Sequence, residues 1–205
     1  SLDVVSGGRA WLGIGAAWNE EEHLGLGVPY PPLKTRFEQL EETLRIAHQM
    51  WDGNESPYAG THFTLERPLN VPQSLRRPHP PILIGGGGEK KTLRMVAQYG
   101  DACNIFDFGT AGVKGKYDII DAHCAALGRD PREITRTVLT RIALSHTGGQ
   151  PLPSGEKTMS VDQAVAHLAG LAEIGTDIAI LGMANQTEDG AYELVAEVVR
   201  QVETL

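Results

Sequence analysis

The chain has 205 residues, 41% of them apolar and 21% charged, which excludes disordered and collagen-like proteins and fits one globular domain over residues 1–205. Its 26 acidic and 18 basic side chains give a formal charge of -8, which argues against nucleic acid and anionic membranes as partners. With two widely spaced cysteines, no export-type start and no apolar run long enough to span a bilayer, the sequence predicts a cytoplasmic protein with reduced thiols.

Short apolar strands and amphipathic helices alternate along the chain. Residues 9–15 form an apolar run that ends in glycines, which is typical of a buried strand entering a turn. Apolar residues recur at three- and four-residue steps over 37–51 and predict a helix that Gly53 ends. The Gly- and Pro-rich stretch 54–81 predicts a long loop, with a short hairpin through 61–65.

A run of four glycines marks the next unit. The apolar strand 81–84 runs directly into Gly85–Gly88, and the pattern that follows predicts a helix over 93–100. Lys90 and Lys91 are expected among the early residues of this helix. The remaining predicted elements are strands at 102–106, 137–145 and 178–181 and helices at 113–127, 160–175 and 192–202.

Five strand–helix units, with strands made of continuous apolar runs, predict a parallel sheet covered by helices and therefore an α/β fold. Two architectures remain: an open doubly wound sheet, for which five units suffice, and a (β/α)8 barrel, for which they do not. The usual dinucleotide-binding turn is disfavoured because Trp18 and Lys90 occupy the third glycine position of Gly-x-Gly-x-x-Gly in the two glycine turns.

Several sequence blocks in the first half of the chain carry a further signal. They are Ser-Gly-Gly-Arg at 6–9, the strand and turn at 12–20, Arg-Phe-Glu-Gln-Leu-Glu-Glu at 36–42, the tetraglycine block at 80–89 and Tyr-Gly-Asp-Ala-Cys-Asn at 99–104. In order and spacing these blocks resemble the luciferase-like flavin and deazaflavin oxidoreductases, especially their coenzyme F420-dependent branch. Beyond Ile105 the similarity extends only to the pattern of elements.

The resemblance implies a partial (β/α)8 TIM barrel. The five units correspond to its last five, so the chain is expected to lack the amino-terminal three units, in agreement with the roughly 250 residues of a complete barrel. A fragment, a truncated gene product and one half of a two-chain assembly all remain open. The exposed arc of sheet is expected to be covered by a second copy in a homodimer or by the missing amino-terminal part.

Both glycine turns lie where strands end and helices begin, the face at which α/β folds bind ligands. Glycines there let backbone N–H groups approach an anion, and the helix dipole, Lys90 and Lys91 add positive potential. The alternative is that the glycines only permit a tight turn. Gly87 is expected to have a positive φ. The resemblance implies contacts from Gly86, Gly87 and Gly88 to the phosphate, from Ile14, Gly15 and Asn19 along the cofactor, and from Trp18 to its tail. Ala17 departs from the family pattern, which has glycine at that position.

For the reaction, the resemblance implies hydride transfer between reduced F420 and a small organic substrate, on a protein that holds and orients the cofactor. Catalytic residues stay unassigned because the family's catalytic groups lie largely on the first strands. FMN is the alternative cofactor, in a monooxygenase, and a non-catalytic cofactor-binding or dimerisation module is a rival of another class. The seven histidines show no metal-binding spacing, so no metal site is predicted.

Overall fold

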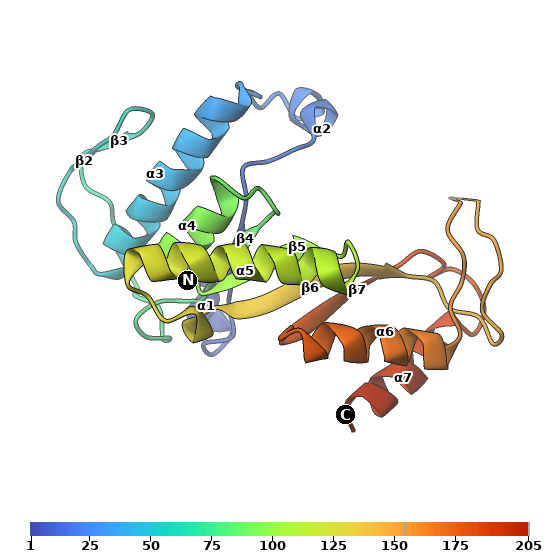
Figure 1. Cartoon of the computed structure of the whole chain (residues 1–205). Helices are drawn as coiled ribbons and strands as arrows, with labels where there is room; N and C mark the ends of the chain where they lie inside the picture. The colour runs from blue at the N-terminus through green and yellow to red at the C-terminus, as the bar shows by residue number, and fades with distance from the viewer. Residues whose placement is uncertain (154, 205) are drawn as a thin grey trace.

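In the computed structural model, which describes residues 1–153 and 155–204, a single parallel sheet of five strands organises the chain. Neighbouring strands are hydrogen-bonded in the order β1, β4, β5, β6, β7, and every pair is parallel (Figure 1). The strands are β1 (Leu12–Ile14), β4 (Ile82–Gly85), β5 (Ala102–Phe106), β6 (Thr135–Ile142) and β7 (Ile178–Met183). The curled sheet forms a half-barrel, which confirms the predicted partial TIM barrel.

Helices follow the strands and cover the outer face of the sheet. The long ones are α3 (Leu33–Trp51), α4 (Thr92–Tyr99), α5 (Thr110–Leu127), α6 (Val161–Glu173) and α7 (Ala191–Val202). Their apolar sides enclose the core with alternate strand residues, among them Ile84, Ile105 and Val138, each fully buried. Removing these side chains from water is the main stabilising contribution to the fold. No helix in the described part of the chain is long and apolar enough to cross a membrane.

The ends of the helices follow local sequence signals. Ser160 and Gln163 form a reciprocal capping box at the start of α6, as their spacing requires. Gly53 after α3 and Gly128 after α5 have φ values of 70° and 69°, the left-handed conformation in which glycine ends a helix without steric cost. These three helix limits were therefore readable from the sequence.

The inner face of the sheet is not covered by helices. On β7, Ala179 and Leu181 pack against the core, whereas Ile178 and Ile180 alternate with them and are 44% and 40% exposed. On β5, Phe106 is 55% exposed. A complete barrel would enclose side chains in these positions, so the inner face of this half-barrel leaves large apolar side chains accessible.

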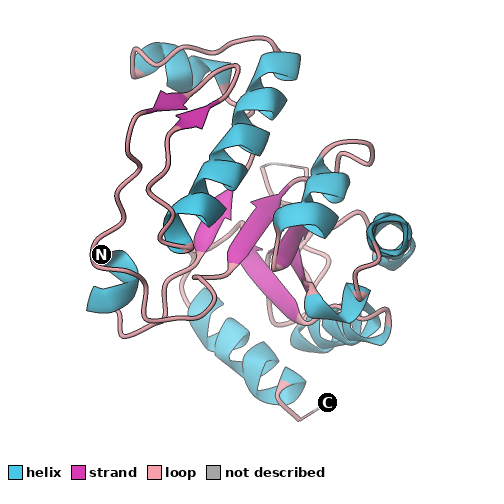
Figure 2. Cartoon of the chain, turned by 90° about the vertical axis from the view of Figure 1, so that its left-hand side faces the viewer, coloured by secondary structure: helices cyan, strands magenta, loops and turns pink. Residues whose placement is uncertain are grey.

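Some elements differ from the prediction. The strand predicted at 137–145 begins and ends earlier, because β6 pairs with β7 only as far as Ile142. The predicted hairpin exists, but its paired residues are β2 (Tyr58–Ala59) and β3 (Thr64–Leu65), beside α3 in Figure 2. Two short helical segments, α2 (Glu20–Gly25) and a 3-10 turn (Pro131–Glu133), were missed because neither is long enough to show an apolar stripe, and α1 (Leu2–Val5) is a single turn at the start of the chain.

Candidate functional site

The turns after β1 and β4 lie side by side at the carboxyl end of the sheet. Ile14 is in register with Ile84, and a Cβ atom placed on Gly15 would lie 3.4 Å from the carbonyl oxygen of Gly85. The Gly86 N–H donates a hydrogen bond of 2.9 Å to the carbonyl of Asn104, the β5 residue that follows in the sheet. The structure therefore brings the two predicted glycine turns together at one edge.

The three glycines after β4 have different structural roles. Gly86 has a φ of 120°, a backbone conformation that disfavours any residue with a side chain. At Gly88 space is limiting, because a Cβ atom there would lie 2.9 Å from Thr92 Oγ1. Gly87 has no positive φ, and its nearest neighbour would be Lys116 Cε at 3.8 Å. The predicted positive φ at Gly87 is therefore wrong: the chain reverses at Gly86, where the N–H turns back to Asn104.

Backbone donors accumulate after this reversal. Among the described residues, the N–H groups of 87–90 have no hydrogen-bond acceptor. Helix α4 begins at Thr92, with Lys91 at the N-cap position, so the helix starts later than the predicted position of Lys90. Consecutive unpaired donors before the amino end of a helix are an arrangement that suits an oxyanion such as phosphate.

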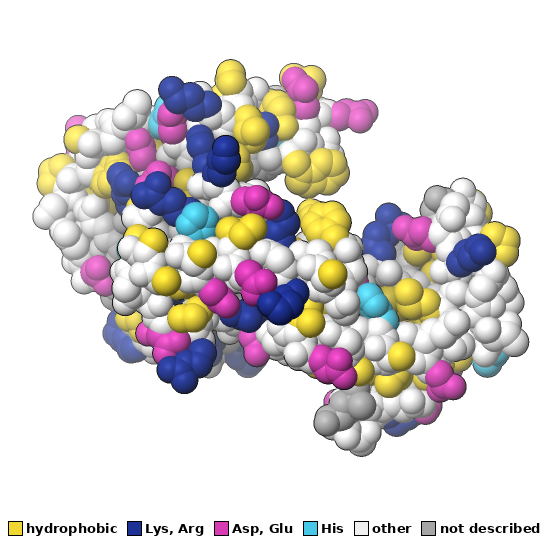
Figure 3. All heavy atoms as spheres, viewed as in Figure 1, with side chains coloured by type: hydrophobic (Ala, Val, Ile, Leu, Met, Phe, Trp, Pro, Cys, Tyr) yellow, Lys and Arg dark blue, Asp and Glu magenta, His cyan; other side chains and the backbone are white. Residues whose placement is uncertain are grey.

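Positive side chains surround the turn. A shallow depression of about 420 Å³ is lined by Phe37, Gly87, Gly88, Glu89, Lys90, Lys91 and Lys116. Lys91 Nζ lies 5.2 Å above the Phe37 ring, and Lys116 Nζ lies 2.7 Å from a carboxylate oxygen of Glu89. Figure 3 shows further Lys and Arg side chains over α3 and α4. In a chain with a net charge of -8, this cluster is a local site of positive potential.

Arg36, near the start of α3, fixes the segment between β1 and α2. Arg36 donates to the carbonyl groups of Ala16 and Ala17, and its guanidinium lies 4.1 Å from the centre of the Tyr30 ring. The Tyr30 hydroxyl donates to the Trp18 carbonyl at 3.0 Å. Ala17 has a φ of 61°, which explains why glycine suits this position better.

The other predicted contacts are placed less directly. Ile14 is half-buried and packs against the core, so its backbone, not its side chain, borders the turn. Trp18 is 83% exposed, and the Asn19 side-chain oxygen accepts the Glu22 N–H at 3.2 Å as the N-cap of α2. In the described ranges no hydrogen bond joins Trp18 or Asn19 to the glycine turn.

Sequence reasoning missed Lys116 and Arg36 as parts of this site. Lys116 lies on α5, well after the turn in sequence, and it reaches the turn only because α5 packs beside α4. His123 marks the same packing, since its Nε2 lies 2.8 Å from the Glu89 carbonyl oxygen. The local sequence around neither cation predicts the contact. The contact can be expected only once the order of the strands is known.

A second polar cluster joins the helices to the sheet. Asp107, which follows β5, accepts hydrogen bonds of 2.6 Å from Thr140 Oγ1 and 2.8 Å from the Gly109 N–H, and it lies 2.6 Å from His167 Nε2. Burial works to raise the pKa of Asp107, but the hydrogen bonds from Thr140, His167 and Gly109 outweigh it and hold the pKa below its usual range. The described residues contain no group of three metal-ligating side chains.

The chain is similar to several known proteins. Residues 1–150 match the family model of the luciferase-like monooxygenases. The chain is 26% identical over 155 residues to an FMNH2-dependent dimethylsulfone monooxygenase of Pseudomonas putida, covering 69% of this chain and 42% of that protein. It is 31% identical over 94 residues to an F420-dependent glucose-6-phosphate dehydrogenase of Microbacterium testaceum, covering 45% of this chain and 26% of that protein.

Among solved structures, an F420-dependent secondary alcohol dehydrogenase superposes with a TM-score of 0.81 at 16% identity, over 98% of this chain and 72% of that one. At that identity the match concerns the fold. The matched part of the chain spans less than half the length of the dimethylsulfone monooxygenase and of the glucose-6-phosphate dehydrogenase. Because the family model covers most of the chain, including both glycine turns, the protein belongs to the luciferase-like monooxygenase family.

Proposed function

We propose that this chain binds a phosphate-bearing redox cofactor, coenzyme F420, in an oxidoreductase that transfers hydride to or from a small organic substrate. The observation that carries the proposal is the turn at Gly86–Gly88, where unpaired N–H groups border a depression lined by three lysines at the carboxyl end of the sheet. This edge is where barrels of this class hold their ligands.

The residues present suit the phosphate end of such a cofactor. Gly87 has neither a positive φ nor a close neighbour, so the space where its side chain would stand is available to an anion. The N–H groups of 87–90 would bind the phosphate, and the turn at Gly15 would border the rest of the cofactor. When bound, the cofactor supplies the hydride chemistry, and this chain contributes binding and orientation.

FMN is the second candidate cofactor, because it also ends in a phosphate and one relative of this chain is an FMNH2-dependent monooxygenase. The same donors and lysines would bind either phosphate. Titration of the purified chain with F420 and with FMN, followed by absorbance and fluorescence, distinguishes the two. Binding of neither would favour a dimerisation module without a cofactor and contradict the proposal.

The variant Gly87→Val tests where the cofactor binds. The valine side chain would occupy the space next to the unpaired N–H groups, and we expect cofactor affinity to fall at least about tenfold. Because Gly87 has no positive φ, the fold should remain intact by circular dichroism. The control is Gly115→Val on α5, where a side chain meets nothing within 4 Å, and affinity should not change. Equal affinity in both variants would refute the placement.

The inner face of the half-barrel belongs to the same proposal. Phe106, Ile178 and Ile180 are exposed there, and β1 and β7 are the two edges of the sheet. We expect this face to be covered in the working enzyme by a second copy of the chain or by an amino-terminal set of strand–helix units. Either one would bury the apolar face and pair the edges.

A further inference from the structure

Lys116 is a cation held next to the glycine turn by a helix that is remote in sequence. Its Cε lies 3.8 Å from the position that a Cβ atom of Gly87 would take, and its side chain is only 22% exposed. The His123 ring, further along α5, lies within hydrogen-bond distance of the Glu89 carbonyl and fixes the backbone of the same segment to that helix. Lys116 is therefore ordered before any ligand arrives.

The other two lysines of the depression are less well placed. Lys91 lies above the Phe37 ring, which already favours its ammonium group there. Lys90 is exposed. Recruiting an exposed lysine requires ordering a long flexible side chain, and this entropy loss weakens the contact. Lys116 avoids most of that loss.

The present partner of Lys116 is a weak one. Glu89 is 57% exposed, so water and salt screen its carboxylate and reduce the contribution of the ion pair. A phosphate beside Gly87 would meet the unpaired N–H groups of 87–90 as well as the lysine. Exchange of the ammonium group from the carboxylate to the phosphate is therefore favourable.

We propose that Lys116 binds the phosphate of the cofactor at the Gly86–Gly88 turn, and that Glu89 holds Lys116 in place until the phosphate displaces it. The proposal rests on the proposed function, since it concerns the same phosphate. It adds a positioned cation, Lys116, and a competing carboxylate, Glu89. Removing the cation should weaken phosphate binding, whereas removing the carboxylate should strengthen it.

The test measures binding to the full chain by titration with FMN, with F420 and with riboflavin, which is FMN without the phosphate. In Lys116→Met we expect affinity for FMN and F420 to fall about tenfold, with riboflavin unchanged. In Glu89→Gln we expect about threefold tighter FMN binding, because a competing carboxylate is removed. The control is Lys114→Met, which removes a lysine two residues away on α5 that pairs with Asp118 at the surface.

Each outcome decides a different question. Equal FMN and F420 affinity in wild type and Lys116→Met would overturn the role of Lys116 and leave the proposed function standing. A parallel loss of FMN and riboflavin affinity, or weaker FMN binding in Glu89→Gln, would mean that the ion pair only supports the fold, and would also overturn it. If the wild-type chain binds neither cofactor, the proposed function fails and this inference fails with it.

Discussion

A glycine is most informative about function at a position where neither a positive φ nor a close neighbouring atom requires it. In the tetraglycine run, Gly86 is required by its φ of 120° and Gly88 by the closeness of Thr92. Gly87 satisfies neither condition. The missing side chain at this position leaves space outside the fold, next to unpaired N–H groups. That combination separates a binding turn from a merely tight one.

Ala17 provides a prediction at the same scale. Its φ of 61° is unfavourable for a residue with a Cβ atom, and Arg36 holds the segment in this conformation through the carbonyls of Ala16 and Ala17. In Ala17→Gly we expect relief of this strain to exceed the added entropy of the unfolded chain. The net gain should be about 0.5–1 kcal/mol, measured as the free energy of unfolding in urea.

The matched control is the preceding residue. Ala16 has no positive φ and its methyl group packs against the core, so Ala16→Gly should lower the free energy of unfolding by about 1 kcal/mol. If both variants destabilise the protein, the left-handed conformation of Ala17 is not a source of strain.

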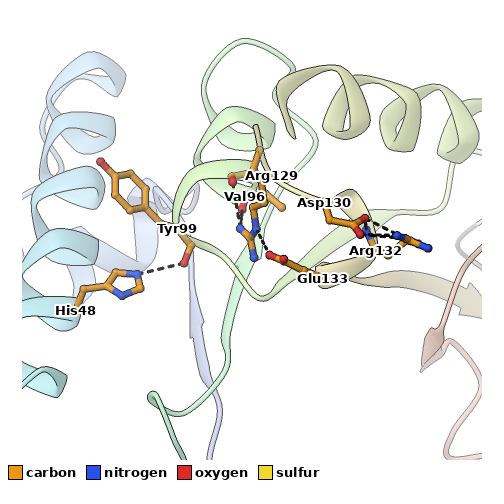
Figure 4. Close-up of polar contacts among 8 residues, drawn as sticks. His48, Val96, Tyr99, Arg129, Asp130, Arg132 and Glu133 are labelled. Carbon is orange, nitrogen blue, oxygen red and sulfur yellow. Dashed lines mark hydrogen bonds and ion pairs between the residues drawn. The ribbon is translucent and has the colours of Figure 1, made fainter. Parts of the chain in front are cut away.

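At the scale of elements, α4 is fixed at both ends. Its amino end follows the glycine turn, and Arg129 donates from its guanidinium to the carbonyl groups of Val96 and Ala97 near its carboxyl end (Figure 4). A cation there adds a donor to the last carbonyls of the helix, of which Val96 already accepts the Gly100 N–H, and interacts favourably with the helix dipole. The arginine therefore helps to hold the helix that presents the N–H groups of the turn.

We expect Arg129→Met to lower the free energy of unfolding by about 1–2 kcal/mol, or Tm by roughly 2–6 °C, in a calorimetric scan. Arg132→Met is the control, because Arg132 is 89% exposed and pairs with Asp130 at the surface (Figure 4). Its effect should be close to zero, as for other surface pairs. Similar losses in the two variants would argue against a specific role for Arg129.

Two carboxylates of α3 hold the β2–β3 hairpin: Glu38 lies 3.0 Å from His62 Nε2, and the buried Glu42 contacts the hairpin backbone. Glu42 accepts hydrogen bonds from the N–H groups of Thr61, His62 and Phe63, at 2.7, 3.1 and 3.0 Å. Burial tends to raise the pKa of Glu42, but the three N–H donors outweigh it and hold the pKa below its ordinary value of 4.5. Because the pKa is lower in the folded protein, the stabilisation is present above pH 4.5 and is lost as the pH falls below it.

Amide hydrogen exchange measures this loss directly. In the wild type, exchange at Thr61–Phe63 should accelerate, relative to the rest of the protein, when the pH falls below about 4.5. Glu42→Gln should show fast exchange at these three residues at neutral pH. A pH-independent hairpin in the wild type would contradict the assignment.

Prediction from sequence succeeded where the signal was local. Patterns among neighbouring residues predicted the five strands, the long helices and the capping box at Ser160. It failed where the cause lay elsewhere in the chain. The reversal at Gly86 depends on the Asn104 carbonyl of the next strand, and Lys116 reaches the site through helix packing. Such contacts need the order of strands in the sheet before they can be expected.

For the whole molecule, the main consequence of the half-barrel is its uneven distribution of apolar surface. The outer face of the sheet is covered by the long helices, whereas the inner face exposes Phe106, Ile178 and Ile180. Contiguous apolar surface on a soluble protein is usually an interaction site, and two open sheet edges reinforce the tendency. Fold and association are therefore linked in this chain.

We expect the isolated chain to self-associate through the inner face. Light scattering over a dilution series should give a concentration-dependent mass, and Ile180→Lys should weaken association at least about tenfold, because the interface would bury an unpaired charge. Leu127→Lys is the matched control: Leu127 is 45% exposed, but it ends α5 on the outer side of the sheet, so its replacement should leave the mass unchanged. A wild-type chain that stays monomeric and unfolds cooperatively at high concentration would show that the inner face needs no cover.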